Sequence, residues 1–155
     1  METIFTTESG RELSYYGAAL GEQKAEFMGK AITLNELFAQ LIQVCDIDTA
    51  VPYCQHDYDK ANDPTYGQGA VFAMIVQDIF GGTLHKKTTD DGGRPYFNQI
   101  DGNYIDLARD QFDLYDIEFD YDPNQLVNRR VLDSGADVSK RYQLLKERLV
   151  KALVD

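Results

Sequence analysis

The chain has 155 residues, and its 26 acidic and 15 basic side chains give a formal charge of -11. This length fits one domain, and a hydrophobic content of 43% is enough to build a core. The acidity argues against a protein that binds nucleic acid or an anionic membrane over a broad surface, because both need an excess of Lys and Arg. With two cysteines, the chain has neither a disulfide scaffold nor an all-cysteine zinc site.

No targeting segment is expected. Residues 1–10 carry no basic stretch followed by an apolar one, as a secretory signal would. The longest mostly apolar stretch, residues 70–80, is interrupted by Gln77 and Asp78 and is too short to span a bilayer. We therefore expect a soluble cytoplasmic protein with reduced thiols and no membrane partner.

The charge is uneven along the chain. Residues 1–127 hold 8 basic against 22 acidic side chains, a balance of -14, and residues 128–155 hold 7 against 4, a balance of +3. We expect the basic segment to pair with the acidic body of the same chain. The alternative is that it docks on an acidic partner or a second copy, which would make the protein a structural, self-associating homo-oligomer.

The first half of the chain favours helices. Residues 1–31 have a weak helical period interrupted by glycines, and we predict an appendage that precedes a single domain over residues 32–155. Thr33 and Glu36 have the spacing of a capping box, and the apolar residues that follow predict a helix to Cys45. Residues 46–66 predict a long loop, and residues 67–80 a second, well-buried helix.

From residue 83 onward the spacing of apolar residues changes from the helical period to alternation, a period of two residues. Strands are predicted at residues 83–89, 96–100, 103–107 and 115–121, the middle two joined by the hairpin signal Asp101-Gly102. A closing helix follows at residues 137–154, with a basic outer face. The fold class is therefore α+β, with N-terminal helices packed on an antiparallel sheet and a closing C-terminal helix.

Several runs in consistent order carry a family resemblance. The most informative, Tyr66-Gly67-Gln68-Gly69-Ala70, opens the second helix. The runs are residues 62–71, 76–82, 96–98, 101–102, 105–112 and 140–146. Together they resemble the YunG-like family of small uncharacterised bacterial proteins over residues 33–153.

The resemblance implies a papain- or transglutaminase-like core. In that pattern a cysteine stands at the start of the helix, a histidine precedes a strand, and an aspartate lies on the next strand. Here Gly69 stands at the position of the cysteine and Pro95 at that of the histidine, so only Asp106 is retained. Because glycine has no nucleophile and proline no base, the resemblance implies a non-catalytic, pseudoenzyme-like protein.

We expect the vestigial cleft to bind a peptide segment or a small ligand, without a cofactor. The residues expected to contact it are Tyr66, Gln68, Tyr96, Asn98 and Asp106. Gln68 has two interpretations. It could donate to an anion or carbonyl beside the start of the helix, or it could cap the helix or bond to the preceding loop, which the sequence favours.

The alternative enzyme uses another thiol. Cys54 and His56 are two positions apart, so on an extended segment they would face the same side, as a cysteine-dependent hydrolase or transferase requires. This spacing is unspecific.

No metal site is expected. Cys45, Cys54, His56 and His85 match no zinc template, and the acidic run at residues 57–63 lacks the ligands of an EF-hand. The acidic residues Asp116, Glu118, Asp120 and Asp122 predict a solvated strand face, and His85 an exposed position.

Overall fold

The computed structural model describes residues 4–88, 95–108 and 119–154. It is a mixture of helices and antiparallel sheets, which confirms the α+β class. No helix in these three ranges is long and apolar enough to cross a membrane. The elements are β1 (Phe5–Thr6), β2 (Glu12–Leu13), η1 (Ala18–Leu20), β3 (Lys24–Phe27), β4 (Lys30–Thr33), α1 (Leu34–Val44), η2 (Ile47–Thr49), α2 (Pro52–Gln55), α3 (Gly69–Phe80), β5 (Thr83–Lys86), β6 (Tyr96–Ile100), β7 (Asn103–Ile105), β8 (Gln125–Val127), α5 (Arg129–Ser134) and α6 (Ala136–Val154).

The predicted capping box at the start of α1 is confirmed. The Thr33 hydroxyl accepts from the Glu36 backbone N–H at 3.0 Å, and the Glu36 carboxylate accepts from the Thr33 N–H at 3.0 Å. The two bonds satisfy two N–H groups that the first turn of a helix leaves without partners. They fix the start of α1, whose apolar side faces the core.

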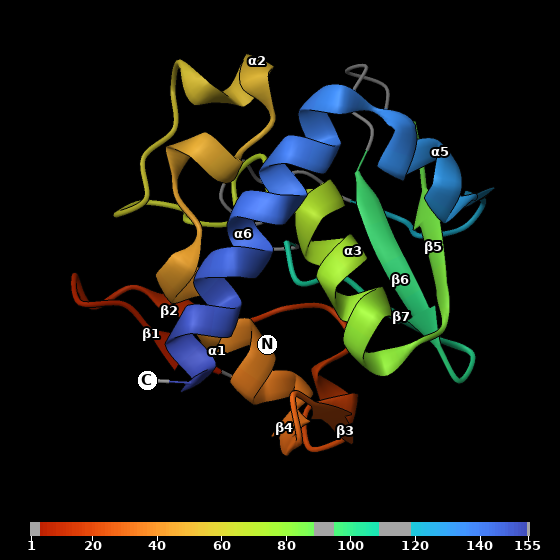
Figure 1. Cartoon of the computed structure of the whole chain (residues 1–155), viewed down its shortest axis with the longest axis horizontal. Helices are drawn as coiled ribbons and strands as arrows, with labels where there is room; N and C mark the ends of the chain where they lie inside the picture. The colour runs from red at the N-terminus through yellow and green to blue at the C-terminus, as the bar shows by residue number, and fades with distance from the viewer. Residues whose placement is uncertain (1–3, 89–94, 109–118, 155) are drawn as a thin grey trace.

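Helix α3 is the centre of the molecule. Its apolar residues surround the whole helix, and nearly all are buried. One side of α3 contacts α6 and another contacts β5 and β6 (Figure 1). A helix that is apolar all round needs such cover on every side, and the fold provides it.

The main sheet has the order β7-β6-β5-β8, with all neighbours antiparallel. Side chains alternate between its two faces. Leu84 and Ile105 belong to the core on the α3 side, whereas His85 stands directly opposite Phe97 on the other face. We call the face that carries His85 and Phe97 the outer face.

Ion pairs within the chain hold α5 and α6 against the acidic body. Arg148 bonds Asp48 at 2.5 Å, and Arg129 bonds Asp78 at 2.8 Å. The almost fully buried Arg141 donates to the Thr49 carbonyl at 3.2 Å. The expected pairing of the basic segment with the acidic body is therefore present at Arg129 and Arg148, and Arg141 adds a hydrogen bond to the backbone.

The N-terminal residues form two hairpins and a 3₁₀ turn, so the weak helical spacing of their apolar residues does not correspond to an α-helix. Met28 and Gly29 both have positive φ, 55° and 77°, which joins β3 to β4 in a tight turn. Leu13 and Tyr15 are fully buried in the same core as α1 and α3. This segment is thus packed into the domain.

Other differences from the sequence-based prediction are local. The 46–66 loop contains the short helices η2 and α2, and both β8 and α5 were missed. Most of the strand predicted at 115–121, including Asp116 and Glu118, lies outside the described residues, and residues 119–121 are not a strand.

Candidate functional site

Gly69 is the first residue of α3 and lies against the start of β6. A Cβ placed on Gly69 would be 3.6 Å from the Tyr96 backbone nitrogen and 3.7 Å from its oxygen, which is ordinary van der Waals contact. Pro95 directly precedes Tyr96, and its carbonyl accepts from the Lys87 N–H at 3.2 Å. The structure therefore brings the helix start beside the segment that begins with Pro95.

Gln68, which precedes α3, is fully buried. Its Nε2 donates to the Asp46 carbonyl at 3.0 Å, and its Oε1 accepts from the Thr49 hydroxyl at 2.9 Å. It makes no capping bond to α3. The amide is thus occupied by bonds to the preceding segment, as in the second interpretation of this residue.

Asn98 and Asp106 are also buried, on opposite faces of the sheet. Asn98 donates to the Ala73 carbonyl of α3 at 2.9 Å. The Asp106 carboxylate accepts from the Tyr121 hydroxyl at 2.9 Å and from the Ala108 N–H at 3.1 Å. Tyr121 packs on Phe97, 4.8 Å between ring centroids, so Asp106 belongs to the outer face. The structure does not gather the five expected ligand contacts around one opening.

The two tyrosines of the set, Tyr66 and Tyr96, are half-buried. The Tyr66 hydroxyl donates to Asp57 at 3.1 Å. Burial, followed by hydrogen bonding with Cys54, raises the pKa of Tyr66. This phenol therefore stays protonated and can both donate and accept.

Cys54 and His56 do not face the same side. The segment is the helical turn α2 instead of an extended strand, so positions two apart diverge. Cys54 is buried, and burial raises the pKa of its thiol. The His56 side chain is 76% exposed and lies 3.9 Å from Asp57. The geometry that favoured a Cys54–His56 pair is absent.

Cys45 is a core residue on the buried side of α1's C-terminal end, as its helical spacing predicted. Its thiol contacts the Pro64 carbonyl at 3.3 Å, and burial raises its pKa to about 12. Among the residues that the structure describes, no three His, Cys, Asp or Glu side chains are grouped as a metal site would require.

A polar chain on the outer face was missed from the sequence. Thr83 Oγ1 lies 2.7 Å from His85 Nε2, and His85 Nδ1 lies 2.8 Å from Asn124 Oδ1. His85 is only 8% exposed, so its predicted surface position was wrong: the rings of Phe97 and Tyr104 cover it. Because Asn124 is far along the chain, only the alternation of Thr83 with His85 was available as a sequence signal.

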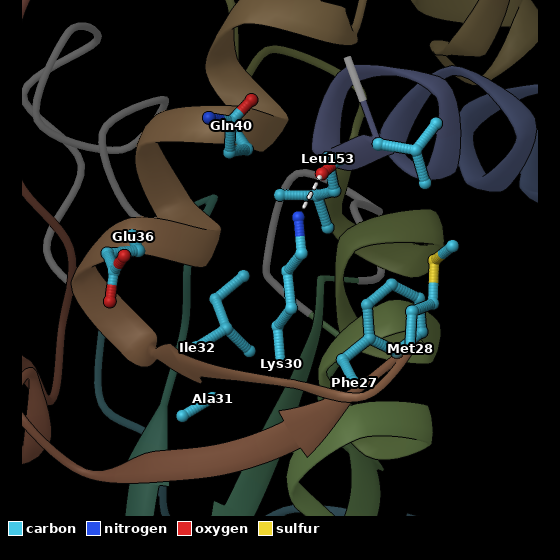
Figure 2. Close-up of a pocket in the computed structure, with 9 residues that line it drawn as sticks. Phe27, Met28, Lys30, Ala31, Ile32, Glu36, Gln40 and Leu153 are labelled. Carbon is cyan, nitrogen blue, oxygen red and sulfur yellow. Dashed lines mark hydrogen bonds between the residues drawn. The ribbon is translucent and has the colours of Figure 1, made fainter.

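A separate pocket of about 150 Å³ lies between the β3–β4 hairpin, α1 and the end of α6. Its walls are mainly apolar and include Phe27, Ile32 and Leu153. Figure 2 shows Lys30 crossing it to the Leu153 carbonyl, a bond of 3.3 Å. Figure 1 shows this hairpin near the C-terminal end of α3, away from the start of that helix.

The fold and these sites define a small α+β domain, and comparison with known proteins identifies its family. The model of the family described as YunG protein matches residues 33–154, so the chain belongs to this family. The Uncharacterized protein YunG of Bacillus subtilis (strain 168) is similar to it, 33% identical over 84 residues that cover 54% of this chain and 68% of that protein. No solved structure matches the chain.

Proposed function

We propose that the protein is a binding domain with a papain- or transglutaminase-like core, whose pseudoenzyme-like, non-catalytic cleft at the start of α3 holds a peptide segment or a small ligand. One observation carries the proposal. Gly69 lies beside Tyr96, where the resemblance expects a nucleophile next to a histidine, and neither Gly69 nor Pro95 supplies a reactive group.

The space around Gly69 supports the proposal that a side chain has been lost at this position. A Cβ would fit there without a close contact, and the backbone does not have the positive φ that favours glycine. Gly67, two residues earlier, differs: its φ is +76°, and a Cβ would be 2.9 Å from that of Cys54. Glycine is therefore required by the fold at Gly67 and not at Gly69.

The five expected contact residues divide into two roles. Tyr66 and Tyr96 are half-buried and can offer ring surface and hydroxyls to a ligand. Gln68, Asn98 and Asp106 are buried with partners inside the protein, and we assign them to holding α3, β6 and β7 in place. We also propose a cytoplasmic location, in which the two cysteines stay reduced.

The test is an NMR titration of the ¹⁵N-labelled protein with N-acetyl amino-acid amides that carry apolar, aromatic and acidic side chains. The proposal predicts saturable shifts at the amides of Gly69 and Tyr96, with each probe recovered unchanged. Tyr96→Ala should weaken binding, whereas Tyr53→Ala, which changes an exposed tyrosine on α2, should not. Shifts confined to the pocket around Lys30 would contradict the proposal. It would also be contradicted if the protein hydrolysed a probe and the Gly69→Val variant lost that hydrolysis.

A further inference from the structure

The chain Thr83–His85–Asn124 crosses the outer face of the sheet. Thr83 and His85 are two positions apart on β5 and share that face. Asn124 comes from the segment just before β8, which pairs with β5. Contacts of 2.7 Å and 2.8 Å link the three side chains, one to each ring nitrogen of the histidine.

The contacts of Asn124 determine the direction of these hydrogen bonds. Its Nδ2 donates to the Tyr121 carbonyl at 2.9 Å, and a carbonyl can only accept. The Asn124 Oδ1 therefore faces His85 and accepts from Nδ1–H. In the neutral ring Nε2 then carries the lone pair, so it accepts the hydroxyl proton of Thr83.

The surroundings separate the base from solvent and leave the hydroxyl accessible. The His85 ring stacks on Phe97 at 6.0 Å and meets the edge of Tyr104 at 6.0 Å. Thr83 is exposed and is the first residue of β5. Leu126, directly opposite His85 on β8, is 69% exposed and offers an apolar surface on the same face of the sheet as His85.

We propose that Thr83 is a nucleophile for acyl transfer from small activated esters, with His85 as its general base and Asn124 as a positioning residue. A nucleophile, a base and a group that orients the base are the three parts that such chemistry needs. This activity goes beyond the proposed binding function, because Gly69 begins α3, which packs on one side of the sheet, and Thr83 lies on the outer face.

The proposed reaction balances in two steps. Thr83 Oγ1 forms a bond to the acyl carbon while its proton passes to His85 Nε2, and the ester bond breaks as the leaving alkoxide departs with that proton. Water then attacks the acyl-threonine, giving its proton to His85. The acid is released, and the proton returns to Thr83 Oγ1.

The test uses p-nitrophenyl acetate with the full chain and locates the acetyl group by peptide mass spectrometry. The proposal predicts acetylation of Thr83 well above that of Thr88, an exposed threonine just beyond the end of the same strand. Thr83→Ser should retain the reaction, Thr83→Val should abolish it, and Thr88→Val should leave it unchanged. His85→Ala should slow it about 100-fold or more.

Two further measurements separate chemistry from folding. Added imidazole should restore part of the rate in His85→Ala, which a merely structural histidine would not allow. Asn124→Asp keeps an acceptor for Nδ1–H and should retain more of the rate than Asn124→Leu at matched melting temperature. Equal acetylation of Thr83 and Thr88, or a Thr83 rate independent of His85, would overturn the proposal whether or not the Gly69 cleft binds its probes.

Discussion

At the residue scale, the polar side chains near the start of α3 connect segments that are distant in the sequence. Gln68 joins α3 to the segment at Asp46 and Thr49, and Asn98 joins β6 to the backbone of α3. A buried amide without partners would cost free energy, so these bonds specify how the segments meet.

Replacing Gln68 by leucine tests this structural role. Gln68→Leu removes both bonds, while the Asp46 carbonyl keeps the Thr49 backbone N–H as a donor at 3.1 Å. At about 0.5–1.5 kcal/mol for each hydrogen bond, we expect a loss of about 1–3 kcal/mol in the free energy of unfolding. Urea denaturation measures it. Gln43→Leu, at an exposed position on α1, is the matched control and should change stability by less than about 0.5 kcal/mol. Equal effects of the two variants would count against the role.

The two thiols should be unreactive in the folded protein. Burial raises the pKa of Cys45 from 9.0 to about 12 and also raises that of Cys54. Since the thiolate is the reactive form, a disulfide reagent at pH 8 should label both far more slowly than after unfolding, with roughly a thousandfold less thiolate at Cys45. Rapid native labelling of Cys54 would instead favour the alternative enzyme.

The same shift has a consequence for stability. The folded state holds the Cys45 proton more tightly than the unfolded chain does. The contribution of this pKa difference to the free energy of unfolding is therefore complete below about pH 9 and is lost as the pH rises through about 12.

At the element scale, the start of α3 contains two glycines with opposite requirements. Gly67→Ala imposes a positive φ on an L-residue and a close contact with Cys54, so we expect a loss of about 1–2 kcal/mol or more. Gly69→Ala meets only ordinary contacts and should change stability by less than about 1 kcal/mol. Thermal melts of the two variants compare them, and a larger loss for Gly69→Ala would contradict the view that this position accepts a side chain.

Elements with a strong local signal could be predicted from the sequence. The capping box at Thr33 and Glu36, the apolar run of α3 and the Asp101-Gly102 hairpin each fix their element through neighbouring residues. The missed elements have no such signal: β8 has three residues, too few to show alternation, and α5 has six, less than two helical turns. Both exist because tertiary contacts stabilise them.

The site was harder to predict because it depends on contacts between distant residues. The resemblance identified Gly69 and Pro95, and the structure brings the helix start beside Tyr96. The resemblance could not show that Asp106 bonds Tyr121, or that Asn124 contacts His85, which is 39 positions away in the sequence. Single-sequence periodicity carries no information on such pairs.

At the scale of the whole molecule, the segment before the family match is part of the core. Tyr15 packs on Phe38 with ring centroids 4.8 Å apart, and Tyr16 forms a backbone bridge with Asp106. These contacts join the N-terminal segment to α1 and to the residue after β7, and Leu13 and Tyr15 are part of the same core cluster as α1.

Residues before the family match should therefore be needed for stability. Leu13→Ala opens a cavity in the shared core, and we expect a loss of about 2–5 kcal/mol, measured by urea denaturation. Leu126→Ala, at an exposed leucine, should change stability by less than about 0.5 kcal/mol. If the two variants were equally stable, residues 1–31 would be the appendage that the sequence predicts.

The central claim is that Gly69 and Pro95 stand where a thiol and its base have been lost. The direct test is to restore both and to measure the rate of alkylation by iodoacetamide at pH 7. We predict that the thiol of Gly69→Cys reacts faster than Cys45 or Cys54, because it stands at the start of a helix, and that adding Pro95→His raises the rate further. An introduced thiol no more reactive than the native two, with a rate unchanged by the histidine, would contradict the claim.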